Sequence, residues 1–180
     1  MPDMSAPSSN DHAAPGAPAP HPADQALLLD QQLCFALYSS TLLMTKLYKP
    51  HLDTLGLTYP QYLVMLALWE QDDQVVNQLG ARLGLDSGTL TPLLRRMEGH
   101  GWIVRQRDER DERRVRVRLT PEGQGLKLRA REVPTAMRCL IGGSDDEMAS
   151  LRSALHELRH RLGEGAEGGT DDGKAKASGR

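Results

Sequence analysis

The chain has 180 residues, with 22 basic and 24 acidic side chains and a formal net charge of −2 at pH 7. This length suits one domain with tails, and its two cysteines are too few for the disulfide framework of a small secreted protein. No apolar run approaches membrane-spanning length, and residues 1–23 lack the basic and apolar regions of a signal peptide. We therefore expect a cytoplasmic protein that does not bind a membrane.

Two terminal segments lack the apolar periodicity of packed structure. Residues 1–23 are rich in Pro and Ala, and residues 164–180 are rich in Gly, Asp and Lys. Both segments are predicted to be disordered tails, which leaves residues 24–163 as the folded part.

The folded part opens with two apolar helices. The first is predicted from near Asp24 to about His51, because leucines recur along it at helical spacing. The leucines expected to be buried are Leu29, Leu33, Leu37, Leu43 and Leu47. After the turn DTLGL, residues 59–70 (YPQYLVMLALWE) predict a strongly apolar second helix with a proline near its first turn.

Two shorter helices follow on either side of Gly84. The first covers residues 75–83, and its apolar side chains fall on one face. The second ends near Met97 and carries Arg95 and Arg96. Two short helices around a glycine turn, with the second bearing arginine, predict a helix-turn-helix motif.

The start of this second helix is left open by the residues themselves. Pro92 favours a start at Thr91, which would then be the N-cap residue. Asp86 and Ser87 would instead cap an earlier start, at the cost of a kink where the proline lies within the helix.

A β-hairpin is predicted directly after the helix-turn-helix. The stretches WIVRQR and VRVRLT alternate apolar and polar residues, and the segment RDERDERR between them forms a tip with charges of both signs. Arg116 and Arg118 alternate with valine and are expected on a solvated face of the hairpin. A helix-turn-helix followed by a basic hairpin is a winged helix. The expected fold class is therefore mainly α with a small β-hairpin wing.

Two helices are predicted after the wing. Thr120 caps a helix that starts at Pro121. Ser144 and Glu147 form a capping box that opens a last amphipathic helix through Leu162.

Basic charge is concentrated in the winged helix, although the whole chain is slightly acidic. Residues 75–120 contain ten arginines and six acidic residues. Because arginine suits phosphate and guanine, we expect double-stranded DNA as a partner, with the second helix in the major groove. The side chains of that helix suited to phosphates and base edges are Ser87, Thr89, Thr91 and Arg95. At the wing tip, Asp111 is expected to orient an arginine through a charge-assisted pair, and Arg110 to assist in binding.

Cys34 is the candidate for chemical sensing. It shares a helical stretch with Tyr38 and Tyr48, and Tyr59 follows in the next helix. The thiolate is the form that attacks a peroxide, and phenolic O–H groups stabilise a thiolate by hydrogen bonding. Tyr38 and Tyr48 share the helical face of Cys34, but Tyr48 lies about 21 Å further along the axis and would reach Cys34 only from an antiparallel partner subunit. The alternative is that Cys34 is a small buried apolar side chain.

Several motifs along the folded part resemble one known family. The wing follows the pattern D-x-R-x-x-x-V-x-L-T, which is formed by Asp111, Arg113, Val117, Leu119 and Thr120. Three further stretches carry the likeness: LGLTYPQYLVMLALWE, LDSGTLTPLLRRME and DERDERRVRVRLT. Together they resemble the MarR family of dimeric winged-helix repressors, and within it the OhrR-type regulators of organic hydroperoxide resistance. The resemblance covers about residues 30–135 and implies a winged helix-turn-helix domain with N-terminal and C-terminal dimerisation helices. It also implies a homodimer that leaves a palindromic operator when an organic hydroperoxide oxidises it.

The resemblance also implies roles for single residues. Cys34, in the setting L-C-F-A-L-Y, matches the reactive cysteine of the family. Tyr38, Tyr48 and Tyr59 match the tyrosines of its sensor pocket. At the wing tip, Arg113 matches the arginine that enters the minor groove of DNA.

One subgroup of the family has a second, resolving cysteine, and Cys139 falls where that residue would lie. The resemblance then implies that oxidised Cys34 forms a disulfide with Cys139 of the other subunit, which would break the spacing of the two DNA-reading heads. A mixed disulfide or overoxidised sulfur at Cys34 stays open as the end product. The operator, the target gene, the preferred peroxide and the role of the tails are open as well.

Three other functions fit parts of the sequence. A repressor of the same fold could be released by a bound phenolic ligand instead of by oxidation. A thiol peroxidase would use a reactive cysteine but would leave the arginine-rich head without a role. The motif H-E-x-x-H at 156–160 has the spacing of a zinc protease site, but only a polar segment beyond it offers a third ligand. We therefore expect no enzyme activity, no metal and no cofactor.

Overall fold

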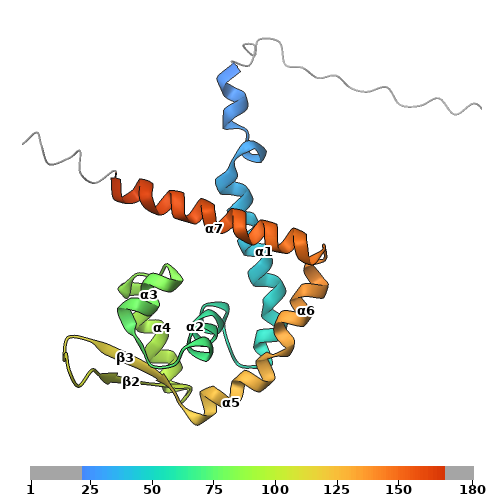
Figure 1. Ribbon diagram of the computed structural model, residues 1–180. Helices are drawn as coiled ribbons and strands as arrows, with labels where there is room; N and C mark the ends of the chain where they lie inside the picture. The colour runs from blue at the N-terminus through green and yellow to red at the C-terminus, as the bar shows by residue number, and fades with distance from the viewer. Residues whose placement is uncertain (1–21, 169–180) are drawn as a thin grey trace, which may run out of the picture. The chain divides into compact units, whose positions relative to one another are not determined.

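The computed structural model describes residues 22–168 (Figure 1). Most of both predicted tails, residues 1–21 and 169–180, lies outside the described residues. Both tail boundaries need correction, because Pro22 begins a short 3-10 helix and the last helix runs on to Gly168.

The chain divides into two units, residues 1–46 and 47–180, and each is described by itself. The first unit contains two 3-10 helices and the beginning of a long α-helix: Pro22–Leu27, Leu29–Gln31 and α1 (Leu33–Asp53). Helix α1 continues across the division, so its last turns belong to the second unit.

The start predicted for the long helix, near Asp24, was wrong. Leu28 has extended backbone angles (φ −64°, ψ 132°), which interrupt the helical hydrogen-bond ladder before α1 begins. The predicted burial of leucines along this stretch was also wrong for the single chain, since Leu33 is 60% and Leu43 62% exposed. Leu29 is exposed too, and Leu47 is 38% exposed. Helical spacing defines an apolar face but does not specify what covers it.

The core of the second unit forms around α2 (Tyr59–Glu70), which has the predicted bounds. The Thr58 amide donates to Gln61 Oε1 at 2.8 Å, which satisfies one of the free donors at the helix start. Helix α1 ends beside this core with Leu52 buried. The side chains that are almost fully buried are Leu52, Tyr62, Val64, Met65, Leu68, Leu79, Leu90, Leu94, Met97, Ile103, Val117 and Met137.

The helix-turn-helix is present as predicted, with α3 (Val76–Leu83) followed by α4 (Ser87–Gly99). Gly84 ends α3 with φ 66°, a left-handed conformation that costs glycine little. The Asp86 carboxylate accepts the Thr89 N–H at 2.8 Å, so α4 has the earlier of the two starts and runs through Pro92. The alternative start with Thr91 as N-cap is therefore wrong.

The wing is a hairpin of β2 (Ile103–Arg107) and β3 (Val115–Leu119), and a short strand that the sequence did not predict, β1 (Gln74–Val75), pairs with β3. The three strands are antiparallel in the order β1-β3-β2. In the hairpin, Ile103 lies opposite Leu119, and Ile103 turns into the core. The sheet is therefore anchored at its base, while the tip projects beyond the strands (Figure 1).

Three helices complete the second unit: α5 (Pro121–Ala130), α6 (Glu132–Ile141) and α7 (Asp145–Gly168). Both predicted caps are confirmed, because Thr120 Oγ1 accepts the Gly123 N–H at 3.0 Å and Ser144 exchanges hydrogen bonds with Glu147. No helix among residues 22–168 is long and apolar enough to cross a bilayer.

Candidate functional site

Helix α4 has one buried side and one exposed side. The buried residues are Leu90, Leu93, Leu94 and Met97, whose spacing defines a single apolar face. On the other side Arg95 is exposed, and so is Arg96, which the sequence analysis had not selected. Thr91 is half-buried, whereas Ser87 and Thr89 are exposed in the first turn. The Thr89 hydroxyl donates to Oδ2 of the N-cap residue Asp86 at 3.1 Å, so it also stabilises the helix cap.

The wing tip, between β2 and β3, is shaped by two aspartates. Asp108 accepts the Arg110 N–H at 2.9 Å, and Asp111 accepts the Arg113 N–H at 3.1 Å. The Asp111 carboxylate also lies 3.2 Å from Nε of Arg114, which is therefore the arginine held by the expected charge-assisted pair. Arg110 and Arg113 are exposed, and no ion pair holds either side chain among the described residues. The tip thus presents two unpaired guanidinium groups to solvent.

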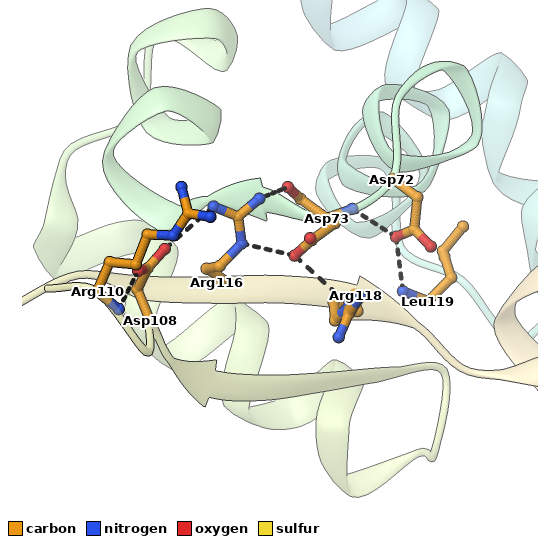
Figure 2. A network of polar contacts seen from close by, with 7 residues as sticks. All are labelled: Asp72, Asp73, Asp108, Arg110, Arg116, Arg118 and Leu119. Carbon is orange, nitrogen blue, oxygen red and sulfur yellow. Dashed lines mark hydrogen bonds and ion pairs between the residues drawn. The ribbon is translucent and has the colours of Figure 1, made fainter. Parts of the chain in front are cut away.

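Behind the tip, Arg116 of β3 is the centre of a polar network (Figure 2). Its Nε and Nη2 donate to the carboxylate and the carbonyl oxygen of Asp73, at 2.7 and 2.6 Å. Its Nη1 donates to the Asp108 carboxylate at 3.1 Å, and Arg118 lies 3.5 Å from Asp73. The expected solvated face is confirmed for Arg118, which is exposed, and only in part for Arg116, whose side chain is 35% exposed but pairs with two carboxylates.

The network is ionised at neutral pH. The hydrogen bond from Arg116 lowers the pKa of Asp73, and the backbone N–H of Arg110 together with Arg116 lowers that of Asp108. The same contacts raise the pKa of Arg116. Asp72 adds a hydrogen bond from an uncharged donor, since its carboxylate accepts the Leu119 backbone N–H at 2.9 Å. Sequence reasoning missed this site because Asp73 and Arg116 lie 43 positions apart and only the pairing of β1 with β3 brings them together.

Two of the predicted sensor tyrosines lie together in the second unit. The rings of Tyr48 and Tyr59 are 5.0 Å apart between centroids, and the buried Tyr62, which was not predicted, lies 5.9 Å from Tyr48. Burial raises the pKa of Tyr48 and of Tyr59, and it raises the pKa of Tyr62 to about 12 with help from its two neighbours. All three phenols therefore keep their protons at neutral pH and can donate hydrogen bonds.

Both cysteines are exposed and reduced in the single chain. Cys34 lies near the start of α1 in the first unit, with Tyr38 also exposed one turn further on. Cys139 lies on α6 in the second unit, on the side opposite the buried Val133 and Met137. Cys34 is therefore not buried in the single chain, and its reactivity stays a prediction.

The histidines of the H-E-x-x-H motif, His156 and His160, are exposed on α7. Within residues 22–168, no group of three or more potential ligands from His, Cys, Asp and Glu comes together. His160 instead lies 3.4 Å from Glu164 on the same exposed helix.

Comparison with known proteins places the chain among regulators of transcription. Residues 46–129 match the family model of the transcriptional regulator SarA/Rot. The chain is similar to the organic hydroperoxide resistance transcriptional regulator of Bacillus subtilis (strain 168), with 49% identity over 134 residues, which are 74% of this chain and 91% of that protein.

Two solved structures of AbfR, a protein of Staphylococcus epidermidis, are also similar. Reduced AbfR bound to DNA has a TM-score of 0.64 and 35% identity, covering 76% of this chain and 96% of that chain. Disulfide-formed AbfR has a TM-score of 0.52 and 33% identity, covering 80% of this chain and 96% of that chain.

Proposed function

Because the chain belongs to the winged-helix transcriptional regulators of the MarR and SarA/Rot type, we propose that it is a homodimeric DNA-binding repressor that releases its operator when an organic hydroperoxide oxidises Cys34. The observation that carries the DNA-binding part is the wing tip. Arg110 and Arg113 are exposed there without ion pairs among the described residues, while Asp108 and Asp111 hold the backbone that bears them.

The recognition surface combines this tip with the outer side of α4. Arg95 and the first-turn hydroxyl of Ser87 supply donors for phosphates and base edges. In a winged helix this helix enters the major groove and the wing the minor groove. Two copies related by a two-fold axis would read a palindromic operator, since each copy binds one half-site.

The sensing part rests on the exposed Cys34 and on likeness to a regulator of organic hydroperoxide resistance. Thiolate attack on the peroxide breaks the O–O bond, transfers one oxygen to sulfur as sulfenic acid and releases an alcohol. Tyr48 and Tyr59 keep their phenolic protons because burial raises their pKa, so they suit the role of donors to a thiolate. In the proposed dimer they come from the partner subunit, because Tyr48 follows Cys34 by fourteen helical positions, about 21 Å.

The sulfenic acid of Cys34 then condenses with the thiol of Cys139 of the other subunit, which forms an S–S bond and releases water. The exposure of both thiols supports this step, and so does the existence of a disulfide-formed AbfR. A bond between α1 of one subunit and α6 of the other would displace the helices that carry the DNA-reading heads.

The test combines a DNA gel shift and a non-reducing gel on the same sample, before and after one equivalent of cumene hydroperoxide. The probe is a duplex selected by the reduced wild-type protein from random-sequence DNA. We expect loss of binding together with a covalent dimer that dithiothreitol reverses.

Two cysteine variants distinguish the oxidation of Cys34 from the formation of the disulfide with Cys139. Cys34→Ser should bind DNA and ignore the peroxide, whereas Cys139→Ser should lose the covalent dimer. If Cys34→Ser is still released by cumene hydroperoxide, oxidative sensing at Cys34 is wrong, and release by a phenolic ligand becomes the function to examine.

A further inference from the structure

The wing tip is supported on one side only. Strand β1 pairs with β3 at two positions, Val75 with Arg116 and Gln74 with Val117. Beyond Arg116, toward the tip, β3 pairs with β2 alone. A two-stranded hairpin is only marginally stable in water, so the exposed end of the wing needs a further constraint to keep one orientation.

Arg116 lies opposite Val75, the last residue of this third strand, and its contacts run from the segment before β1 to the wing tip. Asp73 directly precedes β1 and has a positive φ of 57°, which turns both its carboxylate and its carbonyl oxygen toward Arg116. The guanidinium group is thus held by two acceptors of one residue, and its third nitrogen pairs with Asp108 at 3.1 Å. Such multidentate contacts fix an arginine in direction as well as distance.

The same network continues into the tip backbone. Asp108 follows β2 directly, accepts the Arg110 N–H at 2.9 Å, and donates its own N–H to the Arg114 carbonyl oxygen at 2.9 Å. Arg116 therefore joins the loop before β1 to Asp108, the first residue of the tip (Figure 2). The contacts are partly shielded from water, since the side chains of Arg116 and Asp73 are each 35% exposed and that of Asp108 15%.

We propose that Arg116 is a positioning residue that, held between Asp73 and Asp108, fixes the wing tip so that Arg113 enters the minor groove in register with α4. The proposal rests on the proposed DNA-binding function. It assigns to Arg116 no contact with DNA, and each of its three guanidinium nitrogens already donates one hydrogen bond to Asp73 or Asp108.

A double-mutant cycle tests this coupling on the full reduced chain. The variants are Arg113→Ala, Arg116→Gln and their combination, and the probe is a duplex selected by the reduced wild-type protein from random-sequence DNA. Each single change is expected to weaken binding about tenfold, and the double variant should be no more than about twofold weaker than Arg113→Ala. Additive losses, about a hundredfold in the double variant, would overturn the proposal because they mean that Arg116 acts independently of Arg113.

The direction in which Asp73→Asn changes the affinity for DNA distinguishes a positioning role of Arg116 from a simple effect of charge. Asp73→Asn removes a negative charge near DNA, which by itself should tighten binding. Asparagine tolerates the left-handed backbone of Asp73, so the loop is retained. The proposal predicts weaker binding by about threefold or more, because the charge-assisted hold on Arg116 is lost. Unchanged or tighter binding by Asp73→Asn would overturn it.

Glu109→Gln is the matched control. Glu109 is an exposed acid of the same tip, without an ion pair among the described residues, and its neutralisation should leave DNA binding unchanged or tighter. If Arg116→Gln fails to fold, as judged by its circular dichroism melting curve, Asp73→Asn and Asp108→Asn carry the test. If the wild-type protein selects no duplex, the proposed DNA-binding function is wrong. If it binds DNA but Asp73→Asn does not weaken that binding, only the positioning role of Arg116 is wrong.

Discussion

Glu98, in the last turn of α4, accepts three hydrogen bonds from Arg105 of β2. The Arg105 backbone N–H reaches Oε1 at 2.9 Å, while Nε and Nη2 reach Oε2 at 3.0 and 2.7 Å. The side chain of Arg105 lowers the pKa of Glu98, so the pair is ionised at neutral pH. This contact ties the end of α4 to the middle of β2, the first strand of the wing.

We predict that Glu98→Gln lowers the free energy of unfolding by about 1 kcal/mol, because glutamine removes the ion pair with Arg105 and keeps only one of the two acceptor oxygens, while solvent screens part of the loss. Urea unfolding of the reduced protein measures the change. Asp53→Asn breaks the Lys49–Asp53 pair, whose side chains are 70% and 57% exposed, and should cost less than about 0.5 kcal/mol. Equal losses in both variants would mean that the Glu98–Arg105 contact adds nothing beyond an exposed pair.

The stability of the second unit is expected to decrease in acid. The folded-state pKa values of Asp73, Asp86, Asp108 and Glu98 all lie below their ordinary values of 3.8 for Asp and 4.5 for Glu. A group with a lowered folded pKa stabilises the fold above its unfolded pKa, and this contribution is lost as the pH falls through the folded pKa. The contribution of these four carboxylates should therefore be constant between about pH 5 and pH 8 and fall from about pH 4 downward.

Asp73→Asn provides the internal check on this pH dependence. It removes one carboxylate that must take up a proton on acid unfolding, so the fall in unfolding free energy below about pH 4 should be less steep. Urea unfolding series at several pH values give the slope directly. Identical slopes for wild type and variant would show that Asp73 does not titrate with folding.

Much of the fold follows from local patterns, and the exceptions have physical reasons. The bounds of α2 are predictable because an apolar run begins at a proline in its first turn and ends at Glu70. The hairpin is predictable because strand alternation flanks a charged tip. Strand β1 spans two residues, too few for any alternation to be visible. The start of α4 depended on whether the Asp86 cap outweighed the cost of Pro92, and the Asp86 hydrogen bond settles it.

The candidate site was predictable in part for the same reasons. Arg110 and Arg113 lie at the tip because the hairpin pattern places them there. The pairing of Arg116 with Asp73 and Asp108 was not predicted, because strand alternation shows on which face a side chain lies but not which distant residue contacts it there. The third tyrosine, Tyr62, carries no local signal either, since a buried aromatic in an apolar helix fits a core position equally well.

Gly123 and Gly125 are predicted to respond oppositely to alanine. A Cβ at Gly123 would lie 2.0 Å from the Trp102 carbonyl oxygen, whereas a Cβ at Gly125 meets no atom within 4 Å. The close approach at Gly123 also lets its own carbonyl oxygen accept the buried Trp69 indole N–H at 2.9 Å. Gly123→Ala should therefore destabilise by more than about 2 kcal/mol.

Gly125→Ala should stabilise by about 0.5–1 kcal/mol, because alanine has the higher helix propensity in the interior of α5. Thermal unfolding followed by circular dichroism compares both variants with wild type. A neutral Gly123→Ala would mean that α5 can shift away from Trp102 at no cost.

The phenols of Tyr48 and Tyr59 should control how fast the Cys34 thiolate reacts, if they donate to it across the proposed dimer. Tyr48→Phe and Tyr59→Phe each remove one donor and are expected to slow alkylation of Cys34 by iodoacetamide at pH 7 about tenfold, the equivalent of one hydrogen bond to a charged group. Tyr62→Phe removes the same hydroxyl from the buried member of the cluster, 2% exposed, and should leave the rate unchanged. Measurements in Cys139→Ser confine the label to Cys34. If all three tyrosine variants react at the wild-type rate, the phenols do not reach the thiol, and the exposed cysteine must be activated by another group.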